Sequence, residues 1–147
     1  MAGFTRLDNP ELSKMCLQKH RLASFHNWPF QDEGQEHICT AQKMAEAGFY
    51  SCATEISPDS VRCYVCFKEL EGWEPHDDPW EEHRSHSPNC SFAKKGKVEG
   101  KLTVEEFIKM EMESQQTRVE KLMLEKLEES EKFSQDALEQ LKKLLKV

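Results

Sequence analysis

Residues 61–90 read VRCYVCFKELEGWEPHDDPWEEHRSHSPNC, and the spacing of cysteine and histidine in this stretch decides the fold. Two residues separate Cys63 from Cys66, sixteen more lead to His83, and a further six lead to Cys90. Two cysteines at this spacing lie on one tight turn and can both reach one ion, at about 2.3 Å for zinc. Three thiolates and an imidazole close a tetrahedral shell. The pattern therefore predicts one structural Zn²⁺, with no open position for catalysis.

The alternative is that these four side chains are only buried thiols and a surface imidazole. The ordered spacing of all four favours the metal site. A module of about 80 residues has a thin core, and zinc would supply folding free energy that the core lacks. The remaining cysteines have no partner spacing, and we expect free thiols at Cys16, Cys39 and Cys52.

Composition divides the chain near residue 100. All six glycines and all six prolines lie at or before Gly100, and all six cysteines lie at or before Cys90. Glutamate, lysine, leucine, glutamine and methionine dominate the remainder. We therefore expect an N-terminal arm over residues 1–14, a zinc-binding module over 15–93, a linker over 94–102 and a long amphipathic helix over 103–147.

Local patterns predict the elements of the module. Residues 11–25 have weak helical periodicity, and residues 40–47 indicate a short helix with Thr40 as N-cap and Gly48 just after its end. Residues 61–67 are rich in β-branched and aromatic side chains and predict a strand, with residues 69–73 returning as its partner. Asp78 and Pro79 are typical of a helix start, and that helix would carry His83.

Charge and hydropathy exclude several classes of function. The formal net charge is −7, which makes direct binding to a nucleic-acid phosphate backbone unfavourable. No run approaches the roughly 18–20 apolar residues of a membrane span, so we expect no membrane association. The first residues lack an apolar signal region, and we expect an intracellular protein with reduced thiols. We also find no plausible nucleophile–base pair and predict that the chain is not an enzyme.

An acidic stretch follows the predicted strands. Between Glu69 and Glu82 the chain holds seven acidic residues and no lysine or arginine, with Trp73 inside the run. An exposed indole beside carboxylates would bind a protonated N-terminus with a small first side chain, because the carboxylates pair with the ammonium and the ring covers the methyl group. The alternatives are an ordinary solvated face and a tryptophan that packs in the core.

The C-terminal segment begins with a capping box, formed by Thr103 and Glu106. No glycine or proline interrupts it up to Val147, and a continuous helix of this length would extend about 65–70 Å. It is too long to fold back on a small module, so its apolar stripe must meet other chains. We expect these contacts at Phe107, Ile108, Met112, Val119, Leu122, Met123 and Leu127. A homodimeric coiled coil and a helix that is marginal in the free protein remain alternatives.

Further segments accompany the metal pattern: RLASFHNWP at 21–29, AGFY at 47–50, GW at 72–73, DPWEEH at 78–83 and CSF at 90–92. From Arg21 to Phe92 their order and spacing resemble the baculoviral inhibitor-of-apoptosis repeat. The resemblance implies an α+β fold, in which a three-stranded antiparallel sheet and short helices surround one zinc. The single repeat and the long C-terminal α-helix narrow the resemblance to single-repeat members of the family.

Repeats of this family generally bind peptides that begin with alanine. The resemblance places the groove at Leu70, Trp73, Glu71, Asp77, Lys68 and His86. Glu71 and Asp77 would hold the free amine, and Leu70 and Trp73 would shape the alanine pocket. Lys68 and His86 would flank the third ligand residue, where a cation and an imidazole suit a phosphate. The implied ligand is a phosphorylated histone tail that begins Ala-Arg-phosphoThr-Lys.

The resemblance also implies partners for the helix. These are borealin and the inner centromere protein with its associated kinase, which would form a three-helix bundle in the chromosomal passenger complex. The free protein would be a homodimer through the segment that joins module to helix, with contacts at Leu102, Val104 and Phe107. The implied locations are the nucleus, the centromere and kinetochore of chromosomes, the spindle and midbody, and the cytoplasm.

Two functions follow as expectations. The first is a non-catalytic adaptor that reads the histone tail and supports chromosome segregation and cytokinesis. The second is an apoptosis inhibitor that acts on caspases or on proteins with an exposed N-terminal alanine. Phosphate-dependent binding would favour the first, and inhibition of a purified caspase would favour the second.

Overall fold

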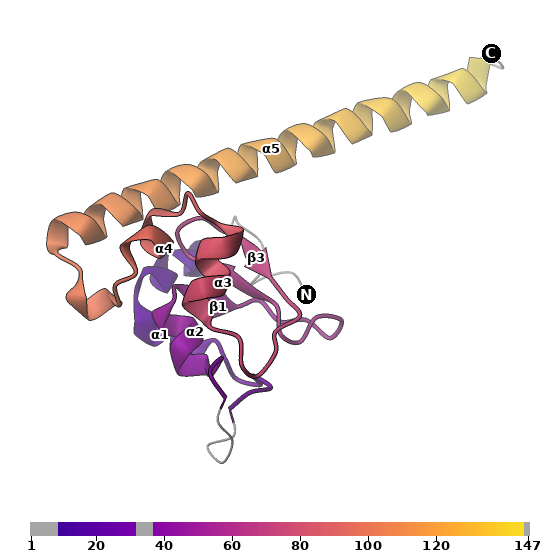
Figure 1. Ribbon diagram of the computed structural model, residues 1–147. Coiled ribbons are helices and arrows are strands. Elements are labelled where there is room, and N and C mark those ends of the chain that lie inside the picture. Colours follow the sequence, from indigo (N-terminus) through magenta and orange to yellow (C-terminus); the bar gives the residue numbers. More distant parts are fainter. Residues whose placement is uncertain (1–8, 32–36, 146–147) are drawn as a thin grey trace.

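The computed structural model describes residues 9–31 and 37–145 of the chain. It consists of a small α+β module and one long helix that begins against the module and extends beyond it (Figure 1). The α+β prediction, with a three-stranded antiparallel sheet and a long C-terminal helix, is therefore confirmed. No helix in the described ranges is long and apolar enough to cross a membrane.

The N-terminal helical segment is split in two. A 3-10 helix, η1, spans Pro10–Cys16, and helix α1 spans Gln18–Ala23. Leu17 between them is extended, which accounts for the weak periodicity of the sequence here. Leu12 and Met15 of η1 are buried in the core of the module. Part of the range expected as an N-terminal arm thus packs with the module, and residues 1–8 of that range lie outside the described residues.

The sheet has the strand order β1-β2-β3, with β1 at Phe49–Ser51, β2 at Val61–Cys63 and β3 at Glu69–Leu70. Both pairings are antiparallel. The predicted strand over residues 61–67 is too long, because the chain leaves the ladder at Cys63 to form a turn. Phe67 closes that turn with a left-handed φ of 56°. The turn presents Cys63 and Cys66 to one point instead of to opposite faces of a strand.

Three short helices flank the sheet. Helix α2 spans Ala41–Glu46, and the Thr40 side chain accepts a hydrogen bond from the Lys43 N–H, as predicted. Gly48 has a φ of +93°, and a Cβ there would lie 2.9 Å from the ring of Phe92. Helix α3 spans Pro79–His86 with Asp78 as its N-cap, again as predicted, and helix α4 spans Ser91–Lys95. The short 3-10 helix η2 follows at Glu99–Lys101.

A buried cation ties the N-terminal helices to the rest of the module. The Arg21 side chain is fully buried, and its guanidinium donates hydrogen bonds to the carbonyl oxygens of Ala45, Met15 and Cys16 at 2.8–3.0 Å. It also lies 4.5 Å from the centroid of the Tyr64 ring. Planar donors in a fixed fork can satisfy several carbonyls at once, which explains why arginine is held here.

The segment between module and helix is ordered by a different charged residue. Glu99 of η2 accepts a hydrogen bond from the Gln18 N–H, and its carboxylate lies 3.7 Å from an Arg21 nitrogen. Part of the range expected as a linker, residues 94–102, therefore packs against the N-terminal helices. Glu99 fixes the route by which the chain approaches the long helix.

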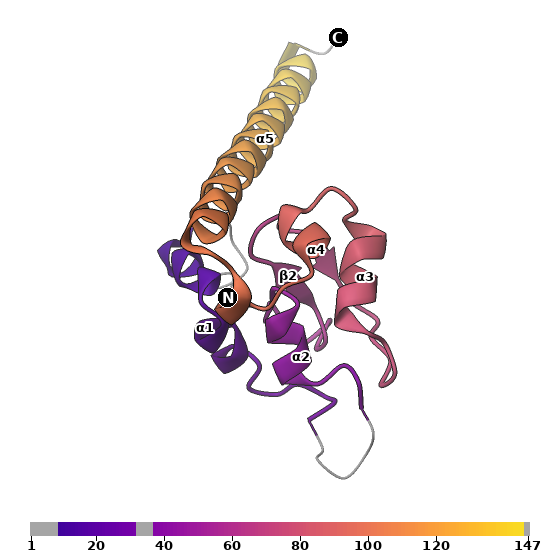
Figure 2. The same cartoon turned by 60° about the vertical axis from the view of Figure 1, so that its left-hand side comes forward.

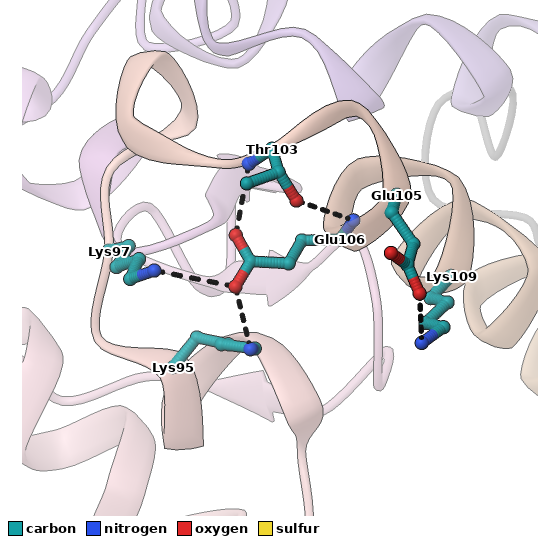
Figure 3. Close-up of polar contacts among 6 residues, drawn as sticks. All are labelled: Lys95, Lys97, Thr103, Glu105, Glu106 and Lys109. Atoms are coloured by element: carbon teal, nitrogen blue, oxygen red, sulfur yellow. Dashed lines mark hydrogen bonds and ion pairs between the residues drawn. The ribbon is translucent and has the colours of Figure 1, made fainter.

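Helix α5 spans Val104–Leu145 and begins with the predicted capping box. The Thr103 hydroxyl accepts from the Glu106 N–H at 3.1 Å, and the Glu106 carboxylate accepts from the Thr103 N–H at 2.9 Å. The same carboxylate pairs with Lys95 at 2.7 Å and Lys97 at 3.3 Å, so it joins α4 and the following turn to α5 (Figure 3). This pairing holds the pKa of Glu106 down at about 2, chiefly through the hydrogen bond from Lys95.

Only the first part of α5 packs on the module. Met110 is buried in the core, and the Ser114 hydroxyl donates to the Tyr64 carbonyl at 2.5 Å. Arg118 donates to the Asn9 carbonyl at 3.0 Å. From residue 123 onward every described residue of α5 is exposed, and both views show this part projecting beyond the module (Figures 1 and 2).

Candidate metal centre and peptide groove

Four side chains predicted as metal ligands converge at one point. The ligand atoms of Cys63, Cys66, His83 and Cys90 all lie within 4.8 Å of one another. Cys63 is the last residue of β2, Cys66 lies in the turn that follows, His83 belongs to α3, and Cys90 directly precedes α4. Three of the four residues are buried, so the site lies at the junction of these elements inside the module.

Backbone groups fix the orientation of these ligands. His83 Nδ1 lies 2.8 Å from the Ala47 carbonyl oxygen, and Nε2 lies 3.7 Å from Cys66 Sγ. A hydrogen bond from Nδ1–H to that carbonyl leaves Nε2 as the free donor atom toward the sulfurs. Ser87 Oγ, just after α3, lies 3.5 Å from Cys66 Sγ and can stabilise a thiolate there.

Three clustered thiols cannot all ionise without a compensating cation. Burial raises the pKa of Cys63 well above its ordinary value. Hydrogen bonds from Cys63 and Cys90 lower the pKa of Cys66. A bound dication would stabilise all three thiolates, because metal binding releases the ligand protons.

The donor set fits a tetrahedral metal site. With a zinc–sulfur bond of about 2.3 Å and a zinc–nitrogen bond of about 2.0–2.1 Å, a tetrahedral angle places the sulfur and the nitrogen about 3.6 Å apart. The distance of 3.7 Å between Cys66 Sγ and His83 Nε2 is close to this value. The other cysteines lie outside the group: the Cys39 thiol donates to the Glu74 carbonyl, and Cys52 pairs with the Ser60 hydroxyl. In the described part of the chain all six cysteines are free of disulfide bonds, as expected.

The six residues predicted for peptide binding lie between Lys68, which directly precedes β3, and His86, which ends α3. Leu70 belongs to β3 and is half-buried, and Glu71 follows it in an exposed position. Asp77 is half-buried, and its carboxylate accepts a hydrogen bond from the Glu74 N–H at 2.8 Å. The Glu71 carboxylate is therefore available to an amine, whereas the Asp77 carboxylate is partly used by its hydrogen bond from the Glu74 N–H.

Trp73 is not the exposed indole that the sequence led us to expect. The residue is only 8% exposed, and its ring packs edge-on against Phe49 with centroids 5.7 Å apart. Its Nε1–H is buried and has no hydrogen-bond partner among the described residues. The indole is therefore largely covered by the module, and it carries an unsatisfied donor.

Asp59 is a positioning residue to which sequence reasoning gave no role. Its carboxylate accepts hydrogen bonds from the backbone N–H groups of Gly72 and Trp73, both at 2.8 Å. Gly72 has a φ of +79°, which glycine adopts without strain. Asp59 thus fixes the turn that carries Glu71 and Trp73. Its position two residues before Val61, within the range that resembles the inhibitor-of-apoptosis repeat, is the sequence feature that could have indicated this role.

Lys68 and His86 are both exposed. His86 Nδ1 lies 3.0 Å from the Glu82 carbonyl oxygen and 3.4 Å from the Glu82 carboxylate, so one ring nitrogen is directed back toward α3. The Nε2 atom is the one left for a ligand. Lys68 lies in the turn that precedes β3, and His86 lies in the last turn of α3. The other four residues predicted for peptide binding lie between them in the sequence.

The residues predicted for partner helices lie on α5 with different exposure. Ile108, Met112, Val119, Met123 and Leu127 are more than half exposed. Phe107 and Leu122 are half-buried, and Leu122 packs against the core of the module. The free stripe continues beyond the predicted set, through Phe133, Leu138, Leu141, Leu144 and Leu145.

A three-stranded sheet with short helices around a Cys₃His group defines the class of protein. The family model for the BIR, the inhibitor-of-apoptosis domain, matches residues 21–94. The chain belongs to this inhibitor-of-apoptosis family, as the sequence resemblance predicted.

Individual relatives are similar over almost the whole chain and are forms of survivin, the baculoviral IAP repeat-containing protein 5. The protein from Mus musculus is 44% identical over 135 residues, which cover 90% of this chain and 94% of the relative. The Rattus norvegicus protein is 44% identical over 142 residues, which cover 95% of this chain and 96% of the relative. The baculoviral IAP repeat-containing protein 5.2-A of Xenopus laevis is 43% identical over 127 residues, which cover 84% of this chain and 79% of the relative.

Proposed function

We propose that the chain is a non-catalytic adaptor of the chromosomal passenger complex. In this proposal the repeat binds the histone N-terminus Ala-Arg-phosphoThr-Lys. Helix α5 binds borealin and the inner centromere protein, and through them a kinase. The adaptor acts at centromeres and kinetochores, and later on the spindle and midbody, with nuclear and cytoplasmic pools. The similarity to survivin over nearly the full length of both chains is the observation that carries this proposal.

The metal in this proposal is one zinc ion held by Cys63, Cys66, His83 and Cys90. Sulfur-rich tetrahedral donor sets favour zinc, and a shell closed by four protein ligands has a structural role. The ion would join the β2–β3 turn to α3 and the start of α4. Because these elements also carry the groove residues, loss of the metal would remove peptide binding together with the fold.

The groove supports recognition of a free N-terminus. Glu71 is exposed after β3, Asp77 lies in the following turn, and the mostly buried Trp73 lies between them in the sequence and would contact the methyl group with the small part of its ring that is exposed. An ammonium group at this position would pair with the carboxylates. Lys68 and His86 would then face the third residue of the ligand, and a phosphate there gains two cationic neighbours when the imidazole is protonated.

Helix α5 supports an assembly role through its exposed apolar stripe. Apolar side chains at Val119, Met123, Leu127, Leu138 and Leu141 recur at helical spacing on a part of the helix that leaves the module. A helix with such a stripe in water gains stability by packing against partner helices. A homodimer of the free protein would use the start of the helix instead, where Val104 is exposed.

Calorimetric titration with synthetic peptides tests the reader function. The three peptides are Ala-Arg-phosphoThr-Lys, its unphosphorylated form and its N-acetylated form. Binding that needs both the free amine and the phosphate is expected. Equal affinity with and without phosphate would reduce the site to a general groove for N-terminal alanine. No binding by any of the three would contradict the proposal.

Membership of the inhibitor-of-apoptosis family favours a second candidate function. The same groove could bind proteins with an exposed N-terminal alanine, or the chain could inhibit caspases. An assay with a purified caspase distinguishes this function. Inhibition at stoichiometric concentrations, together with peptide binding that ignores phosphate, would favour it over the adaptor role.

A further inference from the structure

A cleft of about 410 Å³ lies between the sheet and α5, outside the groove described above. Its module side is formed by residues of β2, β3 and the turn between them. Its helix side is formed by one face of α5. The lining residues are Arg62, Phe67, Lys68, Glu69, Lys121, Leu124, Glu125 and Glu128.

The helix side of the cleft is a separate face from the apolar stripe. Lys121, Leu124, Glu125 and Glu128 follow the spacing i, i+3, i+4, i+7, which places them on one side of a helix. Met110 and Ser114, which contact the module, are four residues apart, and Lys121 follows Ser114 by seven residues. The cleft residues therefore continue the face of α5 that packs on the module. Leu124 is 60% exposed here, although it faces the module side of α5. An exposed apolar residue above this cleft is available to a ligand.

The cleft is lined by three cations, Arg62, Lys68 and Lys121, and by three carboxylates, Glu69, Glu125 and Glu128. On the module side, the Arg62 guanidinium donates to the Glu69 carboxylate, with Nε at 2.9 Å. On the helix side, Glu125 and Glu128 have no hydrogen-bond or ion-pair partner among residues 9–31 and 37–145. Other glutamates of α5 are paired, as with Glu105 and Lys109 at 2.7 Å or Glu139 and Lys143 at 2.9 Å. Lys121 lies on the same side, so the helix side of the cleft has two carboxylates and one ammonium group, and its net charge of −1 favours a cation.

Lys68 and Glu69, at the start of β3, line the cleft, and Lys68 is also one of the residues predicted for peptide binding. In the proposed function the ligand amine lies at Glu71, after β3, and the third ligand residue lies at Lys68, before β3. The ligand therefore runs antiparallel to β3. Successive residues of an extended chain are about 3.3 Å apart along the strand. The fourth and following residues consequently reach the cleft next.

We propose that this β3–α5 cleft is a subsite for the fourth and following residues of the bound peptide, and that Glu125 and Glu128 select a cationic side chain at the fourth position. This inference rests on the proposed peptide function. It assigns to α5 a role in ligand specificity in addition to partner binding. Leu124 and Phe67 supply the apolar contacts for the methylene chain of a lysine, and the two carboxylates pair with its ammonium group.

The test is a cycle of two peptides and two double variants of the full chain. The peptides are Ala-Arg-phosphoThr-Lys-Gly amide and the same peptide with glutamine at position four. The cleft variant is Glu125→Gln with Glu128→Gln. The matched control is Glu131→Gln with Asp136→Asn, which removes the same charge from exposed positions of α5 outside the cleft. Affinities are measured by calorimetry at low salt.

The parent and the control should bind the lysine peptide about two- to fivefold more tightly than the glutamine peptide, the size expected of an exposed ion pair. The cleft variant should bind both peptides equally. An unchanged preference in the cleft variant, or no preference in the parent, would overturn the subsite. Binding of the glutamine peptide by the parent would still uphold the proposed function.

Two other results are equally decisive. If the parent binds neither peptide, the proposed function fails and the subsite fails with it. If the cleft variant changes the oligomeric state in sedimentation velocity while the peptide preference persists, the cleft is a contact between two copies of the chain and the subsite is wrong.

Discussion

At the residue scale, Arg21 connects three parts of the module. Its guanidinium contacts carbonyls at the end of η1 and in α2, and it approaches Glu99 beyond α4. A buried cation is costly unless its charge is compensated. Here Nε and one terminal nitrogen of Arg21 donate to three carbonyls. The other terminal nitrogen has no hydrogen-bond partner in the described part of the chain and lies 3.7 Å from the Glu99 carboxylate. The module therefore depends on this side chain although it lies outside the metal site and the groove.

Replacing Arg21 tests this dependence. Arg21→Met should lower the free energy of unfolding of the metal-loaded protein by about 3–5 kcal/mol, because the carbonyls and Glu99 lose their partner inside the protein. Urea unfolding followed by tryptophan fluorescence measures the change. The exposed Arg84→Met serves as control and should change stability by less than about 0.5 kcal/mol. A similar small loss for Arg21→Met would contradict the role assigned here.

Asp59 gives a second prediction at this scale. Asp59→Asn keeps the shape but removes the charge that holds the Gly72 and Trp73 N–H groups. Peptide affinity should fall about five- to twentyfold, since hydrogen bonds to a charged acceptor contribute about 1.5–3 kcal/mol and part of this is retained by the amide. Calorimetry with the phosphopeptide measures this fall. An unchanged affinity would show that the turn needs no such support.

Glu106 gives a pH prediction. Its folded-state pKa of about 2 is below the ordinary value of 4.5, so the carboxylate stabilises the α4–α5 junction above that value. The contribution is lost as the pH falls from about 4.5 toward 2. An NMR titration of the Glu106 carboxyl should show this low pKa, and Lys95→Met should raise it. A pKa that is unchanged by Lys95→Met would contradict the pairing in Figure 3.

Residues differ in how well the sequence predicts them. The four candidate ligands were predictable because their chemistry and spacing are local. The partners of Arg21 were not, since Ala45 lies 24 residues away and the contact depends on tertiary packing. Trp73 was placed correctly beside the acidic run, but its burial depends on Phe49, which belongs to another strand.

At the scale of the elements, α5 has two parts with different environments. Residues 104–122 contact the module through Met110, Ser114 and Leu122, whereas residues 123–145 are exposed even where Leu124, Glu125 and Glu128 line the β3–α5 cleft. A helix in water that makes no tertiary contact is only marginally stable. The second part should therefore open more readily in the free chain than the first.

Hydrogen exchange followed by mass spectrometry tests this division. Peptides from residues 123–145 should exchange faster in the free protein than peptides from residues 106–118. Addition of borealin and inner centromere protein fragments should slow the distal part most, by tenfold or more. Equal protection of both parts in a monomeric free protein would contradict the division, and unchanged distal exchange with the fragments would contradict the proposed bundle.

The elements also show where sequence patterns fail. Caps are local, so the starts of α2, α3 and α5 were predicted from Thr40, Asp78 and Thr103. The strand over residues 61–67 was overextended because β-branched and aromatic residues favour strands, whereas the turn required by Cys63 and Cys66 ends the ladder. The cleft could not be foreseen, because it requires the angle at which α5 crosses the sheet.

At the scale of the whole molecule, the metal group lies where the β2–β3 turn, α3 and the start of α4 meet. The groove uses the same turn and helix, and α5 packs on Tyr64 inside the Cys63–Cys66 turn. One ion would thus organise peptide binding and the base of the assembly helix together. Zinc binding supplies folding free energy in small domains of this kind.

The most direct test combines native mass spectrometry with near-ultraviolet circular dichroism of the purified chain. All tryptophans and tyrosines lie before residue 81, so the dichroism bands of these two residue types report the module and not α5. We predict one zinc per chain, loss of the aromatic signal on chelation, and the same loss in Cys90→Ser but not in Cys16→Ser. A metal-free chain that keeps its aromatic signal would contradict the metal-centred account.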